Sequence, residues 1–184
     1  MSAWELPTET TINERTYSIR SDFRAILDII TIMSDIELEP QDRTLLTLAI
    51  FYPDFDVMDR RDYQGAVEFM NWFVDGGGDV QPKQKSARFM DWNQDFHLIV
   101  APVNRVLGFE SRSADYLHWW SFLSAYMEIG DCTFAQVVSI RKKKAQGKKL
   151  DKSDQAFYKR NRHLVDLKAK TTQEEDETIS EWIR

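Results

Sequence analysis

The chain has 184 residues, of which 42% are hydrophobic and 29% are charged, and its net charge is −6. This length predicts one domain, or one compact domain with an appended arm, and the composition is typical of a globular protein with a charged surface. Seven glycines and five prolines exclude collagen-like and low-complexity architectures.

The net charge conceals three segments of alternating sign. Residues 1–140 carry 11 basic and 22 acidic side chains, residues 141–170 carry 12 and 3, and residues 171–184 carry 1 and 5. A basic block between two acidic segments can bind nucleic acid, an acidic partner or the acidic body of its own chain. The sequence pI of about 5.1 disfavours a dedicated nucleic-acid-binding protein.

Cysteine usage and hydropathy exclude further classes. The single cysteine, Cys132, excludes an intramolecular disulfide, and one thiol without a nearby histidine does not make a structural zinc site. No apolar run approaches the roughly 20 residues of a membrane-spanning helix, and the first residues lack the basic and apolar regions of a signal peptide. We therefore expect a cytosolic protein without membrane contact.

The first part of the chain, residues 1–20, is expected to form an N-terminal arm. Residues 1–15 are polar with isolated apolar positions, which predicts loose order. Tyr17 and Ile19 alternate with polar residues, and this pattern permits one short extended segment that is too short to define a sheet.

The second part, residues 21–147, is expected to form a helical core domain. Apolar residues recur at spacings of three and four, which predicts three helices over residues 21–34, 40–52 and 60–76. Ser21 is the predicted N-cap of the first of them. From residue 79 to residue 88 the chain is polar, and we expect a flexible loop there.

A fourth helix is predicted to begin after Asp91, because Asp91 and Gln94 have the spacing of a capping box. Its apolar stripe ends at Gly108. Pro102 lies inside the stripe and removes a backbone donor, so we expect a kink or a split near Ile99.

The densest aromatic segment follows, over residues 116–130. Its apolar stripe covers most of a helix, which predicts burial on nearly all sides, with HWW in the core and His118 as a hydrogen-bonded core histidine. The stripe consists of Tyr116, Trp119, Trp120, Leu123, Tyr126 and Met127.

The core domain is predicted to end with a helix that opens at a second capping box, formed by Thr133 and Gln136. Phe134, Val137, Val138 and Arg141 lie on one face of this helix, which runs into three consecutive lysines and stops by residue 147.

The last part, residues 148–184, is expected to form a C-terminal helical arm with a long, polar, basic helix from Lys152 onward and a short final helix capped by Thr172. The final helix carries an apolar patch that needs a covering surface, formed by Ile179, Trp182 and Ile183. With about eight helices, the predicted fold class is all-α: a compact helical domain, a long basic helix and a short terminal helix.

The residues indicate no catalytic constellation. His97, His118 and His163 lie on three different predicted helices without metal-ligand spacing. The triple glycine at residues 76–78 lacks the Gly-Lys-Ser/Thr of a phosphate loop, and the aspartates of residues 54–59 lack the glycine and glutamate of a calcium loop. We predict no enzymatic activity, no cofactor and no metal.

The basic block carries the binding chemistry that the residues indicate. Cations in a last helical turn are also favoured by the helix dipole alone, and aromatics interleaved with cations are typical of single-strand binders. The candidate partner-binding residues are Arg141, Lys142, Lys143, Lys144, Lys148, Lys149, Phe157, Tyr158, Ile179, Trp182 and Ile183.

Four stretches carry a resemblance to a known family: DWNQDFHLIVAPVNRVLGF, LHWWSFLSAYME, FAQVVSIRKKK and SDQAFYKRNRHLVDLK. Their order resembles the gene-product-fifteen family of tailed phages and prophages of Gram-positive bacteria, and IRSDFRAIL resembles its opening motif. HWW and V-x-x-I-R are the more specific parts. The resemblance covers residues 19–168, whereas Pro102 and the acidic end, residues 171–184, depart from the pattern.

The resemblance implies a role in phage morphogenesis and brings no catalytic residues. The family is similar to the small tail assembly chaperones encoded between the major tail protein and the tape measure. It implies a tape-measure or tail tube protein as partner, in the cytoplasm of the host bacterium, and we also consider a homo-oligomer. The alternatives are a structural virion component of the tail completion or connector type, and a nucleic-acid-binding regulator that uses the basic arm.

Overall fold

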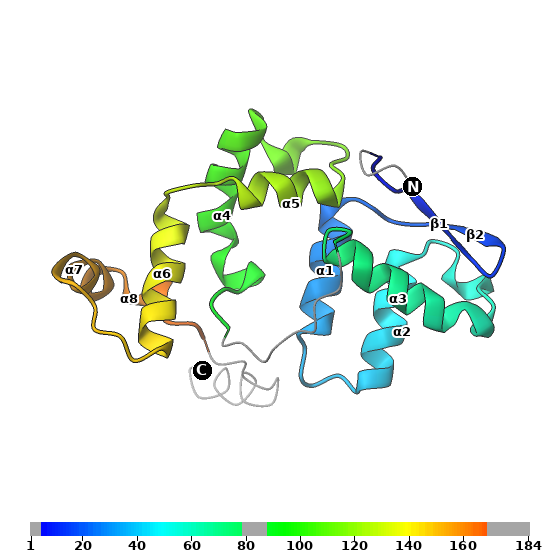
Figure 1. Ribbon diagram of the computed structural model, residues 1–184, viewed down its shortest axis with the longest axis horizontal. Coiled ribbons are helices and arrows are strands. Elements are labelled where there is room, and N and C mark those ends of the chain that lie inside the picture. The colour runs from blue at the N-terminus through cyan, green and yellow to red at the C-terminus, as the bar shows by residue number, and fades with distance from the viewer. Residues whose placement is uncertain (1–4, 79–87, 169–184) are drawn as a thin grey trace, which may run out of the picture.

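The computed structural model describes residues 5–78 and 88–168 (Figure 1). Within these ranges the chain forms eight α-helices, three single-turn 3-10 helices and one small antiparallel sheet, which confirms the mainly helical fold class. The strands are β1 (Glu9–Ile12) and β2 (Arg15–Ser18), and the helices are α1 (Phe23–Met33), α2 (Pro40–Phe51), α3 (Tyr63–Val74), α4 (Trp92–Leu107), α5 (Trp119–Met127), α6 (Thr133–Ala145), α7 (Lys152–Arg160) and α8 (Arg162–Val165). The 3-10 turns are η1 (Phe55–Val57), η2 (Arg60–Asp62) and η3 (Ser111–Ser113).

Two groups of helices flank α4 and α5 in Figure 1, with α1, α2 and α3 on one side and α6, α7 and α8 on the other. The main hydrophobic core is built from the hairpin, α1 to α5 and the start of α6. A second, smaller cluster of Val137, Ile140 and Val165 joins α6 to α8. No helix in the described ranges has the length and apolarity needed to span a bilayer.

The N-terminal residues form a hairpin, so the expectation of loose order is wrong for residues 9–15. Glu9 pairs with Ser18 and Ile12 with Arg15, and the turn places Asn13 and Glu14 at positive φ, as a tight two-residue hairpin requires. The single extended segment predicted from Tyr17 is thus the second strand of a sheet.

The hairpin is ordered because it packs on the body of the protein. Ile12 and Tyr17 are buried in the main core, and the side chain of Ile12 comes so close to Gly65 that a Cβ there would lie 2.7 Å from it. Tyr17 Oη donates to Asp62 Oδ2 at 2.6 Å, and Asn13 Nδ2 donates to Asp62 Oδ1 at 2.8 Å. These two hydrogen bonds hold the pKa of the Asp62 carboxyl below its usual range.

Helix α1 is capped by Asp22, whose carboxylate accepts the backbone N–H of Arg24 at 3.0 Å. Ser21, the predicted N-cap, instead bonds the hydroxyl of Tyr116 at 2.7 Å, and its carbonyl accepts the N–H of Trp119 at 2.7 Å. The start of α1 is therefore joined to the start of α5 through main-chain contacts that one sequence does not reveal. The predicted end of α1 near Ser34 is confirmed.

Helix α4 begins as predicted, since the Asp91 carboxylate accepts the N–H of Gln94 at 2.7 Å. The reciprocal bond of the box comes from Asp95, not Gln94, because the N–H of Asp91 donates to Asp95 Oδ2 at 2.9 Å. Of the kink or split predicted near Ile99, the split is wrong, because α4 continues through Pro102 as one helix; the kink stays a prediction. Ile99 and Pro102 are both buried, so core packing compensates for the missing backbone donor.

Helix α5 is less buried than its sequence predicts. Trp119 is fully buried, with its indole N–H donating to the carbonyl of Val74 at 3.0 Å, and the indole of Trp120 donates to Phe73 O at 2.9 Å. The two indoles of the HWW motif thus bind carbonyls at the C-terminal end of α3, and the prediction that HWW lies in the core is confirmed. By contrast, Tyr116 lies outside the helix at 54% exposure and Met127 is 70% exposed, so one face of α5 is open.

The C-terminal elements differ from the predicted long helix. Asn161, with φ −121° and ψ 33°, interrupts the chain between α7 and α8, and the turn lets Val165 pack against α6. Thr133 is the first residue of α6 rather than its cap, which is Cys132 without a side-chain bond. Of the predicted loop over residues 79–88, only Arg88 is among the described residues. The predicted final helix with Ile179, Trp182 and Ile183 lies outside them.

His118 makes the cap of α5 sensitive to pH. Its Nδ1 accepts the N–H of Trp120 at 3.0 Å, and its Nε2 lies 3.1 Å from the carbonyl oxygen of Pro7, so the neutral ring donates there from Nε2. Burial lowers the pKa of His118, although the Pro7 carbonyl opposes this shift. Protonation of Nδ1 removes the acceptor that caps the helix.

We therefore predict that stability is lost as pH falls below about 6.5, the ordinary pKa of an unfolded histidine, toward the lower folded value. Urea unfolding at several pH values is the measurement. The wild-type midpoint should fall more steeply than that of His118→Asn, which keeps a capping acceptor but takes up no proton. Equal pH slopes for the two proteins would contradict the role assigned to His118.

Candidate functional site

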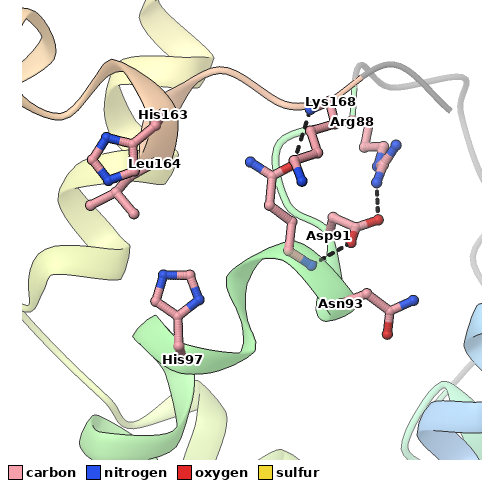
Figure 2. Close-up of a pocket in the computed structure, with 8 residues that line it drawn as sticks. Arg88, Asp91, Asn93, His97, His163, Leu164 and Lys168 are labelled. Carbon is pink, nitrogen blue, oxygen red and sulfur yellow. Dashed lines mark hydrogen bonds and ion pairs between the residues drawn. The ribbon is translucent and has the colours of Figure 1, made fainter. Parts of the chain in front are cut away.

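Two of the three histidines line one cavity, and the third, His118, is buried at the start of α5. His97 on α4 and His163 on α8 line a cavity of about 690 Å³ together with Arg88 and Lys168 (Figure 2). The Gln94 side chain there donates to the carbonyl of Asp166 and accepts from the N–H of Lys168, both at 3.0 Å. Among the described residues, no group of three histidine, cysteine or acidic side chains is placed to hold a metal ion.

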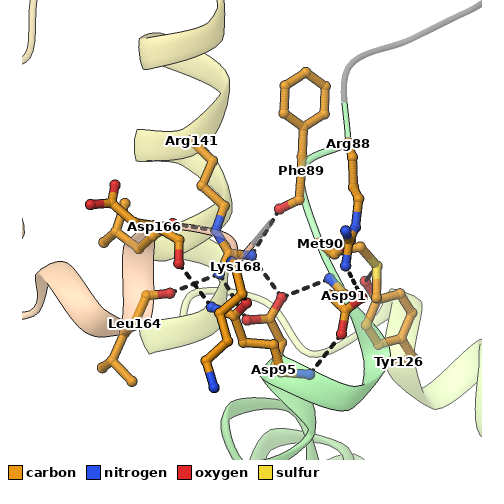
Figure 3. Close-up of polar contacts among 12 residues, drawn as sticks. Arg88, Phe89, Met90, Asp91, Asp95, Tyr126, Arg141, Leu164, Asp166 and Lys168 are labelled. Carbon is orange, nitrogen blue, oxygen red and sulfur yellow. Dashed lines mark hydrogen bonds and ion pairs between the residues drawn. The ribbon is translucent and has the colours of Figure 1, made fainter. Parts of the chain in front are cut away.

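A buried ion pair between Asp95 of α4 and Arg141 of α6 lies at the centre of the C-terminal half (Figure 3). Arg141 Nη1 donates to Asp95 Oδ2 at 2.6 Å, and Arg141 Nη2 donates to Asp95 Oδ1 at 2.9 Å. The side chains of Arg141 and Asp95 are only 5% and 1% exposed. This bidentate geometry is the strongest form of carboxylate recognition by arginine.

The remaining donors of Arg141 bind three backbone carbonyls. Nη1 donates to Phe89 O at 3.0 Å, Nη2 to Leu164 O at 2.7 Å, and Nε to Val165 O at 2.7 Å. A guanidinium has five N–H groups, and all five are therefore used. Arg141 joins α4, α6, α8 and the segment before α4, so this predicted partner-binding residue lies inside the protein.

Two of the predicted lysines bind acidic groups of the same chain. Lys143 pairs with Asp154 on α7, and Lys144 Nζ lies 2.6 Å from Asp166 Oδ1 and 2.8 Å from Tyr158 Oη. Part of the basic block thus holds α7 and the residues after α8 against α6.

The two aromatic residues predicted to bind a partner, Phe157 and Tyr158, also contact other parts of the same chain. Phe157 packs on the cluster that joins α6 to α8. The hydroxyl of Tyr158 lies 3.0 Å from both carboxylate oxygens of Asp166, and the ring of Tyr158 accepts the cation of Lys144 at 4.0 Å from its centroid.

Three of the predicted binding lysines are exposed and make no ion pair with any residue in the described ranges: Lys142, Lys148 and Lys149. Lys142 lies over the ring of Phe89, with 5.7 Å between Nζ and the ring centroid. These lysines are the predicted binding residues that the structure leaves available to a partner.

Lys142 and Lys148 lie on the rim of a groove of about 940 Å³ between α5, α6 and the segment before α4. We call it the α5–α6 groove. Arg88 and Lys143 also line it, and its floor is apolar, formed by Phe89, Met90, Tyr126, Met127, Ile129, Phe134 and Val138. The groove combines an apolar floor with a cationic rim, which suits an apolar helix face flanked by carboxylates.

Sequence reasoning missed the groove floor. Met127 was assigned to a buried stripe, yet it is the most exposed apolar residue of α5, and Tyr126 turns inward, donating to the sulfur of Met90 at 3.1 Å. Burial raises the pKa of Tyr126 to about 12. The sequence does carry a signal for the groove: the apolar stripe is wider than the part of α5 that the neighbouring helices cover, so some of its apolar residues must be exposed.

The model of the family described as Bacteriophage Gp15 protein matches the chain over residues 4–167. The chain belongs to this family. The match confirms the resemblance noted in the sequence and extends it over the N-terminal hairpin. No curated protein and no solved structure matches the chain.

Membership of the bacteriophage Gp15 family establishes a phage protein. The matched range contains every described helix, the buried Asp95–Arg141 pair and the α5–α6 groove. It ends before residues 171–184, so the acidic end and its apolar residues Ile179, Trp182 and Ile183 lie outside the match.

Removing one member of the buried pair should be strongly destabilising, because the other charge is then left buried without a partner. We predict that Arg141→Met or Asp95→Ala lowers the free energy of unfolding by about 3 to 5 kcal/mol. Lys144→Ala, which removes a half-exposed pair, should cost less than about 1 kcal/mol. Urea denaturation checks both values, and similar losses in the two cases would contradict the central role of Arg141.

Proposed function

We propose that this protein is a tail assembly chaperone, which binds the tape-measure protein, the tail tube protein or both while the phage tail is built. Its place of action is the cytoplasm of the host bacterium, and it acts by binding, without an enzymatic step or cofactor. The observation that carries the proposal is the α5–α6 groove, found in a chain that belongs to the bacteriophage Gp15 family.

The chemistry of the groove supports a helical partner. A tape measure is expected to be a long helical chain whose apolar stripes are exposed until the tube covers them. An apolar floor accepts side chains from one helix face at spacings of three and four, and this mode of binding is common among helix-in-groove complexes. The lysines of the rim favour partners with acidic residues beside the stripe.

The state of the basic block argues against the nucleic-acid-binding alternative. Arg141, Lys143 and Lys144 bind carboxylates of the same chain, so these three cations of the basic block are not free to bind phosphates. A nucleic-acid regulator would show affinity that falls steeply with salt, and a flat response would exclude it. The virion-component alternative predicts that the protein is present in purified particles, whereas a chaperone is absent, and mass spectrometry of virions separates the two.

Co-expression with a tape-measure fragment tests the proposed function. We expect the fragment to become soluble and to purify with the chain. Val138→Glu places a charge in the groove floor and Lys142→Glu reverses the rim, and each should weaken binding by about tenfold or more, as measured by calorimetry. Lys152→Glu is the matched control, because Lys152 is exposed at the start of α7 and does not line the groove.

Two results would contradict the proposal. The first is a fragment that stays insoluble and does not co-purify with the wild-type chain. The second is binding that Lys152→Glu weakens as much as Lys142→Glu, since the groove would then have no special role.

A further inference from the structure

The outer face of α2 is apolar and exposed, which is unusual for a helix whose other face is buried in the core. Leu48 and Phe51 are fully buried, whereas Leu45 and Leu46 are 44% and 45% exposed, and Ala49 beside them is exposed too. Ala49 lies four residues after Leu45 and three after Leu46, so the three positions share one side of the helix.

Carboxylates flank this apolar face. Asp42 lies one turn before Leu45 and Leu46, and Glu39 lies at the start of α2, both exposed. The structure pairs Asp42 with no cation of the described part of the chain. The nearest cation in sequence, Arg43, is half-buried and directs its guanidinium toward the carbonyl of Met33 at 3.5 Å. The outer face of α2 therefore combines exposed leucines with negative charge.

The α5–α6 groove has the complementary properties. Its floor is apolar, and Lys142 and Lys148 on its rim are exposed without a carboxylate among the described residues. The groove volume of about 940 Å³ lies within the range of roughly 300–1,000 Å³ that is typical of binding pockets. Leucines from a helix fit the floor, and a carboxylate one turn away meets the rim.

We propose that a second copy of this chain is an occupant of the groove: the outer face of α2 from one copy docks into the α5–α6 groove of another. In Figure 1 α2 lies on the far side of α1 from α6, so the contact is between copies and not within one chain. Two copies related by a twofold axis make this contact twice, which closes the assembly as a dimer.

The small size of one helix face sets the strength of this association. A stable interface buries about 800 Å² on each partner, more than one face of a 12-residue helix provides, so the dimer is held by the two contacts together and depends on concentration. The inference uses the groove but not its assignment to the tape measure. A phage partner that binds the groove competes with dimerisation.

Sedimentation velocity over a wide concentration range tests the proposal. We expect a shift from monomer to dimer in the wild-type chain. Leu46→Glu and Val138→Glu should each weaken dimerisation by about tenfold or more, because each places a charge in an apolar contact. Val57→Glu is the control, since Val57 is 77% exposed and belongs to neither surface, and it should have no effect.

A charge exchange identifies the two surfaces directly. Asp42→Lys and Lys142→Glu should each weaken the dimer, and the chain with both substitutions should recover most of the lost affinity. The proposal is overturned if the wild-type chain is monomeric at every concentration. It is equally overturned if Val57→Glu acts as strongly as Leu46→Glu, or if the double substitution gives no recovery.

The same variants keep this proposal separate from the chaperone function. Leu46→Glu leaves the groove unchanged, so capture of a tape-measure fragment by this variant should equal or exceed that of the wild type. Loss of the dimer with retained capture supports both accounts. Retained dimerisation without capture rejects the chaperone function and leaves the dimer standing.

Discussion

The buried pair of Asp95 and Arg141 is the interaction on which the C-terminal half of the protein depends. The guanidinium of Arg141 binds the Asp95 carboxylate of α4. It also donates to the carbonyl of Phe89, before α4, and to the carbonyl of Val165, at the end of α8. The free-energy cost of burying the two charges is offset, because every guanidinium N–H of Arg141 has an acceptor and both carboxylate oxygens of Asp95 are bound. The segment before α4 is thereby fixed beside α6, and this segment supplies Phe89 and Met90 to the floor of the groove.

The same constraint divides the basic block into two functional parts. Cations that face α7 and α8 neutralise Asp154 and Asp166, so they stabilise the fold and are not available to phosphates. Cations on the opposite side have no such carboxylate in the described part of the chain, and they border an apolar floor. A charge run that reads as one feature in the sequence thus forms ion pairs within the fold on one side and the rim of the α5–α6 groove on the other.

Local signals predicted much of the fold. The cap at Asp91, the start of α2 at Pro40 and the role of HWW follow from neighbouring residues, and the family motifs identified the family. What could not be predicted depends on distant contacts. Asp95 is 46 residues from Arg141, and in sequence it resembles any acidic residue of a first helical turn. The hairpin depends on Asp62 and Gly65, and the break at Asn161 on the burial of Val165 against α6.

Methionine methyl NMR tests the central claim, that the α5–α6 groove is the recognition surface. Met90 and Met127 line the groove, whereas Met58 and Met70 are buried elsewhere in the core. On addition of a tape-measure fragment to the full chain labelled at methionine, the account predicts shifts of the Met90 and Met127 resonances, with Met58 and Met70 unchanged. Binding that leaves Met90 and Met127 unshifted would contradict it.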